Sequence, residues 1–291
     1  LRVAAKNIDL NGADMINEGR GLTLLSAQQD LRLGTVSVGF EENMGEGDHY
    51  RNTALHDVVI SRVAGKGDVQ LQAGNIYSTG ASLEAEKRLI ALADNDLVLG
   101  SVTRASEYEE YHHNETRSTF AKSSETSYDL LNQRQQQGSQ LSGEHILLQA
   151  GHDISAAGVT IVADQDMAIL AGNNVDIRAA ENRYNEQRIR EKKQSGLMSS
   201  GGIGFTIGSK SESHQYDEKG TTQSDARAAI GSLGGNVSIT AGNHVNILGT
   251  DLIAQTDKAI DVRGKTLKVE AGKDIIESSE KHEFKQSGLT V

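Results

Sequence analysis

The sequence predicts an all-β protein built as a right-handed parallel β-helix, a solenoid with coils of about 20–22 residues that is interrupted by long β-hairpin or loop insertions. Three observations predict this fold: a repeat of that length, apolar residues that alternate within each repeat, and the absence of proline from all 291 residues. Proline lacks the N–H donor that a sheet ladder needs, so a chain made mostly of ladders excludes it.

The repeat is visible where an Ala-Gly or similar step returns along the chain. The Ala73 step recurs after 20 residues, the Ala150 step after 21 and the Gly242 step after 22. Within each period the apolar residues occupy every second position, which is the pattern of strands with one buried face. One such stretch contains Ile146, Leu148, Ile154, Val159, Ile161, Met167, Ile169, Val175 and Ile177. Three short strands fill a period, which leaves no room for helices.

Turn-forming residues lie between these strands. Asn and Asp accept the backbone angles of tight turns, and Gly relieves crowding there. Because stacked coils bring equivalent turns together, we expect one corner of the solenoid to carry a ladder of polar side chains. Its predicted members are Asn75, Asp153, Asn174, His244 and Asp274. The acidic residues suggest calcium, but the glycine–aspartate nonapeptide repeat of calcium-binding solenoids is absent, so no metal site is predicted.

Longer segments rich in Ser, Thr, Gln, Glu and Gly break the period. Solenoid segments are expected at about 1–33, 67–102, 143–182 and 235–277. Insertions are expected at about 34–66, 103–142, 183–234 and 278–291. The sequence Lys-Gln-Ser-Gly-Leu at 193–197 returns at 285–289, displaced by 92 residues, so a solenoid segment and its insertion form a larger repeat. The chain is therefore interpreted as one repeat region, 1–291.

Two insertions contain alternating apolar and small or polar residues with one aromatic side chain. The apolar members are Val36, Val38 and Phe40 in the first, and Ile203, Phe205 and Ile207 in the second, which resembles a copy of the first. This alternation is typical of a strand that contacts lipid, although such strands run to about 9–11 residues. These side chains are the candidate membrane-contact residues. The alternative is a hairpin that lies on the rod and covers it with its apolar face.

Composition and motifs argue against several other functions. The net charge of −11 repels phosphate, so no nucleic-acid partner is expected. Cysteine is absent, which excludes disulfides, thiolate zinc sites and cysteine nucleophiles. The sequence has no G-x-S-x-G motif, no phosphate-loop lysine and no carboxylate pair that stands apart from the repeats. The chain is therefore not expected to be an enzyme, and no catalytic residue or cofactor is predicted.

Several local features have simple interpretations. The glycines of 201–208 are not spaced as in a nucleotide-binding loop and suit a strand. The segment His112–Glu115 lacks the spacing of a helical zinc motif, so a solvated loop is expected. The mixed charges of Arg183–Lys193 predict a short helix or a solvated arm. No apolar run approaches the roughly 20 residues of a spanning helix, and because Leu1 is not a start methionine, the chain is expected to be a piece of a longer protein.

Residues 192–264 carry a specific resemblance to a known family. They read KKQSGLMSSGGIGFTIGSKSESHQYDEKGTTQSDARAAIGSLGGNVSITAGNHVNILGTDLIAQTDKAIDVRG. This string closely resembles the C-terminal haemagglutinin repeats of filamentous-haemagglutinin-like exoproteins. These are large proteins of two-partner secretion, and they include the contact-dependent growth inhibition effectors. The resemblance is strongest over 140–291 and weaker over 1–140.

The resemblance implies a function that composition does not show. It implies a β-helical rod exported through an outer-membrane two-partner secretion transporter to the bacterial surface. In growth inhibition effectors, the second haemagglutinin repeat region lies before a C-terminal toxin domain and is implicated in moving that toxin across the target cell's outer membrane. We therefore expect a non-enzymatic delivery segment. An adhesin stalk that binds host or bacterial surfaces is the alternative, and a β-helical polysaccharide-active enzyme is a more remote one.

Overall fold

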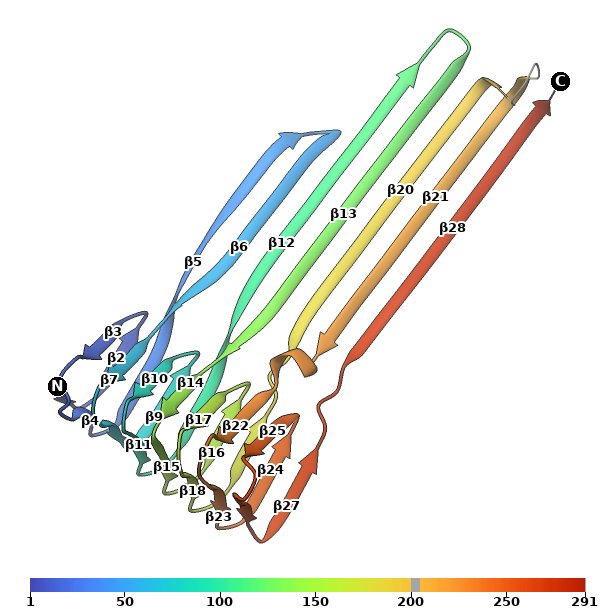
Figure 1. The fold of residues 1–291 in the computed structure, drawn as a ribbon. Helices are drawn as coiled ribbons and strands as arrows, with labels where there is room; N and C mark the ends of the chain where they lie inside the picture. Colours follow the sequence, from blue (N-terminus) through green and yellow to red (C-terminus); the bar gives the residue numbers. More distant parts are fainter. Residues whose placement is uncertain (200–204, 291) are drawn as a thin grey trace.

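The chain folds into a rod from which a broad sheet of long strands extends (Figure 1). The computed structural model describes residues 1–199 and 205–290. Within them the rod is a parallel β-helix whose coils each contribute one strand to each of three parallel sheets. This confirms the predicted fold class. The only helical segment in these residues is one short 3-10 turn, η1 (Ser224–Ala226).

The strands of the rod form three faces. The first face consists of β1 (Arg2–Ala5), β4 (Thr23–Ala27), β8 (Val69–Ala73), β11 (Arg88–Ala93), β15 (His145–Ala150), β18 (Met167–Ala171), β23 (Val237–Ala241) and β26 (Ile260–Arg263). The second consists of β2 (Ile8–Asn11), the start of β5 (Asp30–Glu46), β9 (Asn75–Thr79), the start of β12 (Leu97–Arg117), β16 (Ile154–Ala157), β19 (Val175–Arg178), β24 (His244–Leu248) and β27 (Thr266–Glu270). The third consists of β3 (Asp14–Asn17), β7 (Arg62–Gly65), β10 (Ser82–Ala85), β14 (Gln140–Gly143), β17 (Thr160–Ala163), β22 (Ala228–Ser232) and β25 (Thr250–Ala254).

The core of the rod consists of ladders of inward side chains. On the first face, Leu89 is in register with Val69 of the previous coil and with Ile146 of the next, and the ladder continues through Met167 and Val237. All five side chains are buried. Strand neighbours within a sheet lie about 4.8 Å apart, so each side chain packs directly on its equivalent in the adjacent coil. The regular period of the sequence follows from this stacking.

The glycine of the Ala-Gly step is required by the close approach of successive coils. A Cβ atom on Gly172 would lie 2.0 Å from the carbonyl oxygen of Gly151, and one on Gly242 would lie 2.0 Å from that of Gly172. Any larger residue would collide with the backbone of the previous coil. The step therefore marks the corner at which the first face turns into the second.

The insertions are hairpins, and they form a sheet of their own, which we call the hairpin sheet. Its strands lie in the order β5, β6 (His49–Ile60), β12, β13 (Ala121–Gly138), β20 (Asn182–Ser199), β21 (Phe205–Thr222) and β28 (Ile275–Thr290). Every neighbouring pair is antiparallel. Figure 1 shows these strands extending away from the rod, so they do not lie on the solenoid and cover it.

The hairpins leave the rod from every second coil. The strands β5, β12, β20 and β28 follow the second face in alternate coils, and the coils between them carry only β9, β16 and β24 on that face. Two coils advance the rod by about 9.6 Å, which is also the width of a two-stranded hairpin. Successive hairpins are therefore placed side by side at hydrogen-bonding distance.

The solenoid resumes earlier after each insertion than the sequence predicts. Residues 62–65, 140–142 and 228–232 were expected within insertions, but they belong to the third-face strands β7, β14 and β22. Each of these strands buries only one large apolar side chain, namely Val63, Leu141 or Ile230. Such short segments show no recognisable alternation in the sequence.

Two local predictions were wrong. His112–Glu115 is not a solvated loop, because it lies within β12 and pairs with β13 throughout, and His112 also pairs with β6. Arg183–Lys193 is not helical and lies in β20, between β13 and β21. Pairing with a neighbouring strand on each side outweighs the local preferences of these polar residues.

The ladder packing can be tested with neighbouring leucines of β15. Leu148 is fully buried, whereas Leu147 points outward and is half-buried. We expect Leu148→Ala to lower the free energy of unfolding by about 2–5 kcal/mol because it opens a cavity in the ladder. The matched variant Leu147→Ala should cost about 1 kcal/mol or less. Urea unfolding followed by circular dichroism measures both, and equal losses would contradict the ladder.

Candidate functional sites on the rod corner and the hairpin sheet

The corner between the first and second faces carries a ladder of side-chain oxygens. Each oxygen accepts a backbone N–H from the next coil: Asp96 N–H donates to Asn75 Oδ1 at 3.4 Å, and Asp153 N–H donates to Asp96 Oδ1 at 3.2 Å. Asn174 N–H then donates to Asp153 Oδ1 at 2.9 Å, and His244 N–H to Asn174 Oδ1 at 3.2 Å. These bonds satisfy backbone N–H groups at the corner, where the chain passes from the first face to the second. The structure thus brings Asn75, Asp153, Asn174 and His244 together.

Two residues differ from the predicted ladder. Asp274 lies outside it, because its Oδ1 accepts the backbone N–H groups of Gln223 and Ser224 at 2.8 and 3.0 Å and so holds the turn before β22. In the next coil the residue in register with His244 is Thr266, and Asp274 comes only after β27. Asp96 was missed, since its coil has Ala93-Asp94 where the coils on either side have the Ala-Gly step. Its spacing of 21 residues from Asn75 was the available signal.

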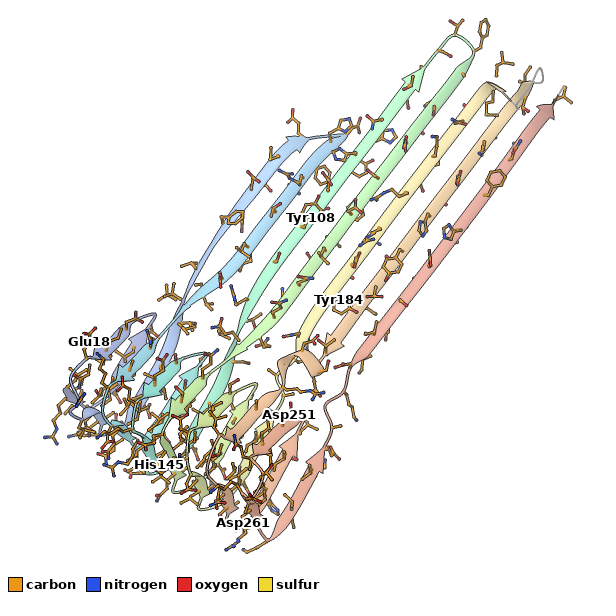
Figure 2. All side chains as sticks on the ribbon, in the orientation of Figure 1. Glu18, Tyr108, His145, Tyr184, Asp251 and Asp261 are labelled. Atoms are coloured by element: carbon orange, nitrogen blue, oxygen red, sulfur yellow. The ribbon has the colours of Figure 1, made fainter. Side chains whose placement is uncertain are left out.

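The hairpin sheet is a single layer with side chains on both faces. Its longer strands contain 17–21 residues, which at about 3.3 Å per residue corresponds to roughly 55–70 Å. In the described chain, no second layer of strands covers it, and Figure 2 shows side chains such as Tyr108 and Tyr184 along its length. A sheet with both faces in water needs polar or amphipathic side chains on both, and this one has them.

Tyrosine–carboxylate groups link neighbouring hairpins across the sheet. Glu109 accepts the hydroxyl groups of Tyr50 and Tyr128, each at 3.2 Å, and so joins β6, β12 and β13. In the third hairpin, Glu218 accepts Tyr184 at 2.9 Å and Tyr216 at 2.6 Å. The bond to Glu218 raises the pKa of Tyr216 to about 12, and the two phenols lower the pKa of the Glu218 carboxyl. Such cross-strand pairs are the unit of stabilisation in a sheet that has no core.

The candidate membrane-contact residues lie at opposite ends of the hairpin sheet. Val36, Val38 and Phe40 are exposed on β5 near the rod, in the same strand pair as Val59 and Leu55. Ile207 lies near the far end of β21. By strand register the two groups are separated by about 40 Å.

The two alternating segments are also not copies of one another. Phe40 lies on β5, which leads away from the rod, whereas Phe205 begins β21, which returns to it. Ile203 lies outside the described residues. A short match of a few alternating residues does not show strand direction, and this is why the two segments look alike in the sequence.

The far end of the hairpin sheet carries an apolar row of which sequence reasoning found only Ile207. Leu197, Ile207 and Leu289 are in register on β20, β21 and β28, and they are 45%, 56% and 69% exposed. We call these three residues the distal row. Phe120, exposed in the turn between β12 and β13, accepts the Leu197 N–H at 2.8 Å. The repeated Lys-Gln-Ser-Gly-Leu motif was the available signal, since it ends on Leu197 and Leu289.

Beside the distal row the backbone requires glycine. Gly196 has a φ of +103°, and a Cβ atom there would lie 2.1 Å from the carbonyl oxygen of Phe120. Gly288 is the equivalent residue, 92 positions later, and pairs with Gly208. The glycine of the repeated motif is therefore structural, and it places the following leucine at the tip. As for helices, none in the described residues is long and apolar enough to cross a membrane.

Comparison with known proteins identifies the region. The Hemagglutinin repeat family matches residues 118–288. The chain is 48% identical over 156 residues to the 16S rRNA endonuclease CdiA of Enterobacter cloacae subsp. cloacae, which covers 54% of this chain and 5% of that protein. It is 36% identical over 261 residues to the toxin CdiA of Escherichia coli, covering 86% of this chain and 8% of that protein.

A third relative has a different nuclease activity in its name. The deoxyribonuclease CdiA of Dickeya dadantii is 35% identical over 232 residues, which covers 78% of this chain and 7% of that protein. The chain therefore spans less than a tenth of the length of these relatives. No solved structure matches the chain.

The corner ladder makes a prediction about Asp153. Asp153→Ala removes the acceptor of the Asn174 N–H and of the Asn173 side-chain amide, so it should lower the free energy of unfolding by about 1–3 kcal/mol. Asp153→Asn keeps a carbonyl oxygen in place, as Asn75 and Asn174 do naturally, and should change stability by no more than about 0.5 kcal/mol. Urea unfolding separates the two variants. An equal loss in both would mean that the charge of Asp153, and not its acceptor, is needed.

Proposed function

Because the chain belongs to the Hemagglutinin repeat family, we propose that it is the non-enzymatic repeat region of a secreted contact-dependent growth inhibition effector, and that it helps a C-terminal toxin of the same polypeptide to cross the outer membrane of a target cell. One observation carries this proposal. The matched relatives are named as nucleases of rRNA and DNA, yet they share this region at 35–48% identity. A region common to proteins that cut different nucleic acids suits a shared delivery step.

The proposal includes a route and a location. The polypeptide reaches the bacterial surface through a two-partner secretion transporter in the outer membrane and then meets the outer membrane of the target cell. A chain without proline or cysteine suits such export, since neither slow prolyl isomerisation nor disulfide formation can trap it before it crosses. The rod then folds coil upon coil outside the cell.

We assign the membrane contact to the distal row. It lies near the far end of the hairpin sheet, and its apolar side chains are exposed. Isolated apolar side chains on a surface are common, but three in register at the end of a projecting sheet form a continuous patch. Ile207, one of the predicted membrane-contact residues, belongs to it.

Charged pairs on both faces of the hairpin sheet, between the rod and the tip, favour membrane contact at the tip and not along the strands. Arg190 donates to both oxygens of Asp129, at 2.8 and 2.7 Å, on one face, and Lys219 pairs with Glu277 at 2.9 Å on the opposite face. Charged side chains that face lipid at the bilayer midplane cost about 2–4 kcal/mol each for Arg and Lys. The present arrangement therefore favours a sheet that stands in water and touches the membrane with its end.

The test uses the full-length effector in a growth inhibition assay. Leu197→Asp with Ile207→Asp should abolish or strongly reduce killing of target cells, while secretion and surface display stay unchanged, because two charges at the tip oppose membrane contact. Ile253→Asp, which charges an exposed apolar residue on the outside of β25, is the matched control and should kill normally. Val38→Asp with Phe40→Asp tests the strip near the rod as a second arm.

The outcomes separate the two functions. Full killing by the distal-row variant would overturn the assignment of membrane contact. Loss of killing together with loss of attachment to target cells would favour the adhesin stalk over toxin delivery.

A further inference from the structure

Four histidines lie in one row across one face of the hairpin sheet. His49 pairs with His112 across β6 and β12, and His214 pairs with His282 across β21 and β28. Strand register places Ser127 and Arg190 of the second and third hairpins between them. Both pairs lie where one insertion meets the next. Phe, Trp and Tyr together make up only 4% of the chain, so aromatic packing is not a general feature of this sequence. The row of four histidines therefore points to a chemical role for the imidazoles.

The pair between β21 and β28 has a carboxylate beside it. Glu280 lies two residues before His282 and so projects from the same face. Its Oε1 is 2.8 Å from His214 Nε2 and 3.1 Å from His282 Nε2, and the two imidazole rings are stacked with centroids 3.9 Å apart. One ligand atom from each residue lies within 4.8 Å of the other two. We propose that His214, Glu280 and His282 form a binding site for one divalent transition-metal ion, with Zn²⁺ as the best fit.

The geometry and the chemistry of these three residues agree with zinc. Zinc binds imidazole nitrogen and carboxylate oxygen at about 2.0–2.2 Å, and tetrahedral ligands at that range lie about 3.3–3.6 Å from one another. The Glu280 oxygen lies 2.8 and 3.1 Å from the two imidazole nitrogens, which is close to those separations. Two His and one Glu leave the fourth position open to water or to a further ligand. Magnesium and calcium prefer all-oxygen sites, so imidazoles disfavour them.

The surroundings support a cation at this position. All three side chains are at least 42% exposed, so an ion can reach them from solvent. The nearest cation in the row, Arg190, is directed to Asp129 of the neighbouring strand and is neutralised there. The net charge of −11 also favours cations over anions.

Asp96, His152 and Asp153 at the rod corner also bring three ligand atoms within 4.8 Å of one another, but two of these residues already serve the corner ladder. At the rod corner, the Oδ1 atoms of Asp96 and Asp153 already accept backbone N–H groups of the ladder. At the β6–β12 pair, His112 meets His49 through Nδ1 at 3.2 Å and Glu110 through Nε2 at 3.1 Å, so its two neighbours lie on opposite sides of the ring. The β21–β28 cluster is therefore the better candidate, because it combines two imidazoles with a carboxylate oxygen that holds no backbone N–H of the ladder.

Metal binding there would join two successive insertions. The ligands come from the returning strand of the third hairpin and from β28, which follows the next pair of coils. In the described chain these strands are otherwise held by the backbone ladder and by exposed side-chain pairs. An ion bound to both would stabilise the far half of the hairpin sheet and make its stiffness depend on available zinc. This role is independent of whether the sheet delivers a toxin or supports an adhesin.

The test is a calorimetric titration of the 291-residue chain with ZnCl₂ in a buffer free of chelators. We expect binding of one Zn²⁺ that MgCl₂ does not displace. His282→Ala should lower the affinity at least about tenfold, since even the loss of an indirect partner costs metal sites 10–100-fold. Glu280→Gln keeps the shape of the side chain and should also weaken binding. Addition of Zn²⁺ should raise the unfolding temperature of the unmodified chain but not that of His282→Ala.

The matched control is His113→Ala. His113 is next to His112 but lies on the opposite face, with its Nδ1 2.8 Å from Thr126 Oγ1, so its loss should leave zinc affinity unchanged. Circular dichroism in the absence of metal verifies that each variant is folded. The proposal is wrong if the unmodified chain binds no zinc, or if His282→Ala and Glu280→Gln bind it as tightly as His113→Ala does.

Discussion

The equal width of two coils and one hairpin is the constraint on which the structure depends. Parallel coils stack at about 4.8 Å because backbone hydrogen bonds fix that spacing, and antiparallel strands of the hairpins pair at the same spacing. A hairpin that leaves every second coil therefore fills the space above two coils without a gap. Insertions in every coil would crowd one another, and insertions in every third would leave unpaired strand edges. The alternation of plain and interrupted coils converts separate hairpins into one sheet.

That constraint explains why a single-layer sheet can persist without a core. The inner strands of the sheet are paired on both sides, as β13 and β20 are, whereas β5 and β28 form its edges. The bases of the hairpins are anchored to a rod with a continuous apolar core. The faces are then free to carry tyrosine–carboxylate pairs, ion pairs and histidines. Exposed apolar residues form two groups, a strip near the rod that includes Val38 and Phe40, and the distal row at the far end. The rod thus fixes the spacing of the hairpins, and the hairpin sheet extends away from the rod. Its far end is the part that we propose contacts the membrane.

Much of the rod could be predicted from the sequence, because its period is enforced locally. The Ala-Gly step recurs since a Cβ atom at Gly172 or Gly242 would strike the previous coil, and the buried ladders impose alternation on every long strand. The third-face strands were not predicted, because β7 and β14 each bury only one large apolar side chain, Val63 or Leu141.

The sites were harder to predict than the rod, because they depend on pairing between distant segments. His214 and Glu280 are 66 residues apart, and nothing near either one in the sequence indicates that they meet. The lengths of the insertions and of the intervening coils decide that register. Likewise, Leu197 and Leu289 were visible only as a repeated motif, and their place at the tip follows from the direction of β20 and β28.

Cross-linking between successive hairpins tests the central claim most directly. Ser123 of β13 and Gln194 of β20 are paired across the boundary between the second and third hairpins. The chain has no cysteine of its own, so Ser123→Cys with Gln194→Cys introduces one defined pair, and directly paired residues lie within reach of a disulfide. The account predicts rapid disulfide formation on mild oxidation of the monomer, and much slower formation for Ser123→Cys with Lys192→Cys, which is displaced by two residues. Equal rates for the two pairs, or no cross-link in either, would contradict a continuous hairpin sheet.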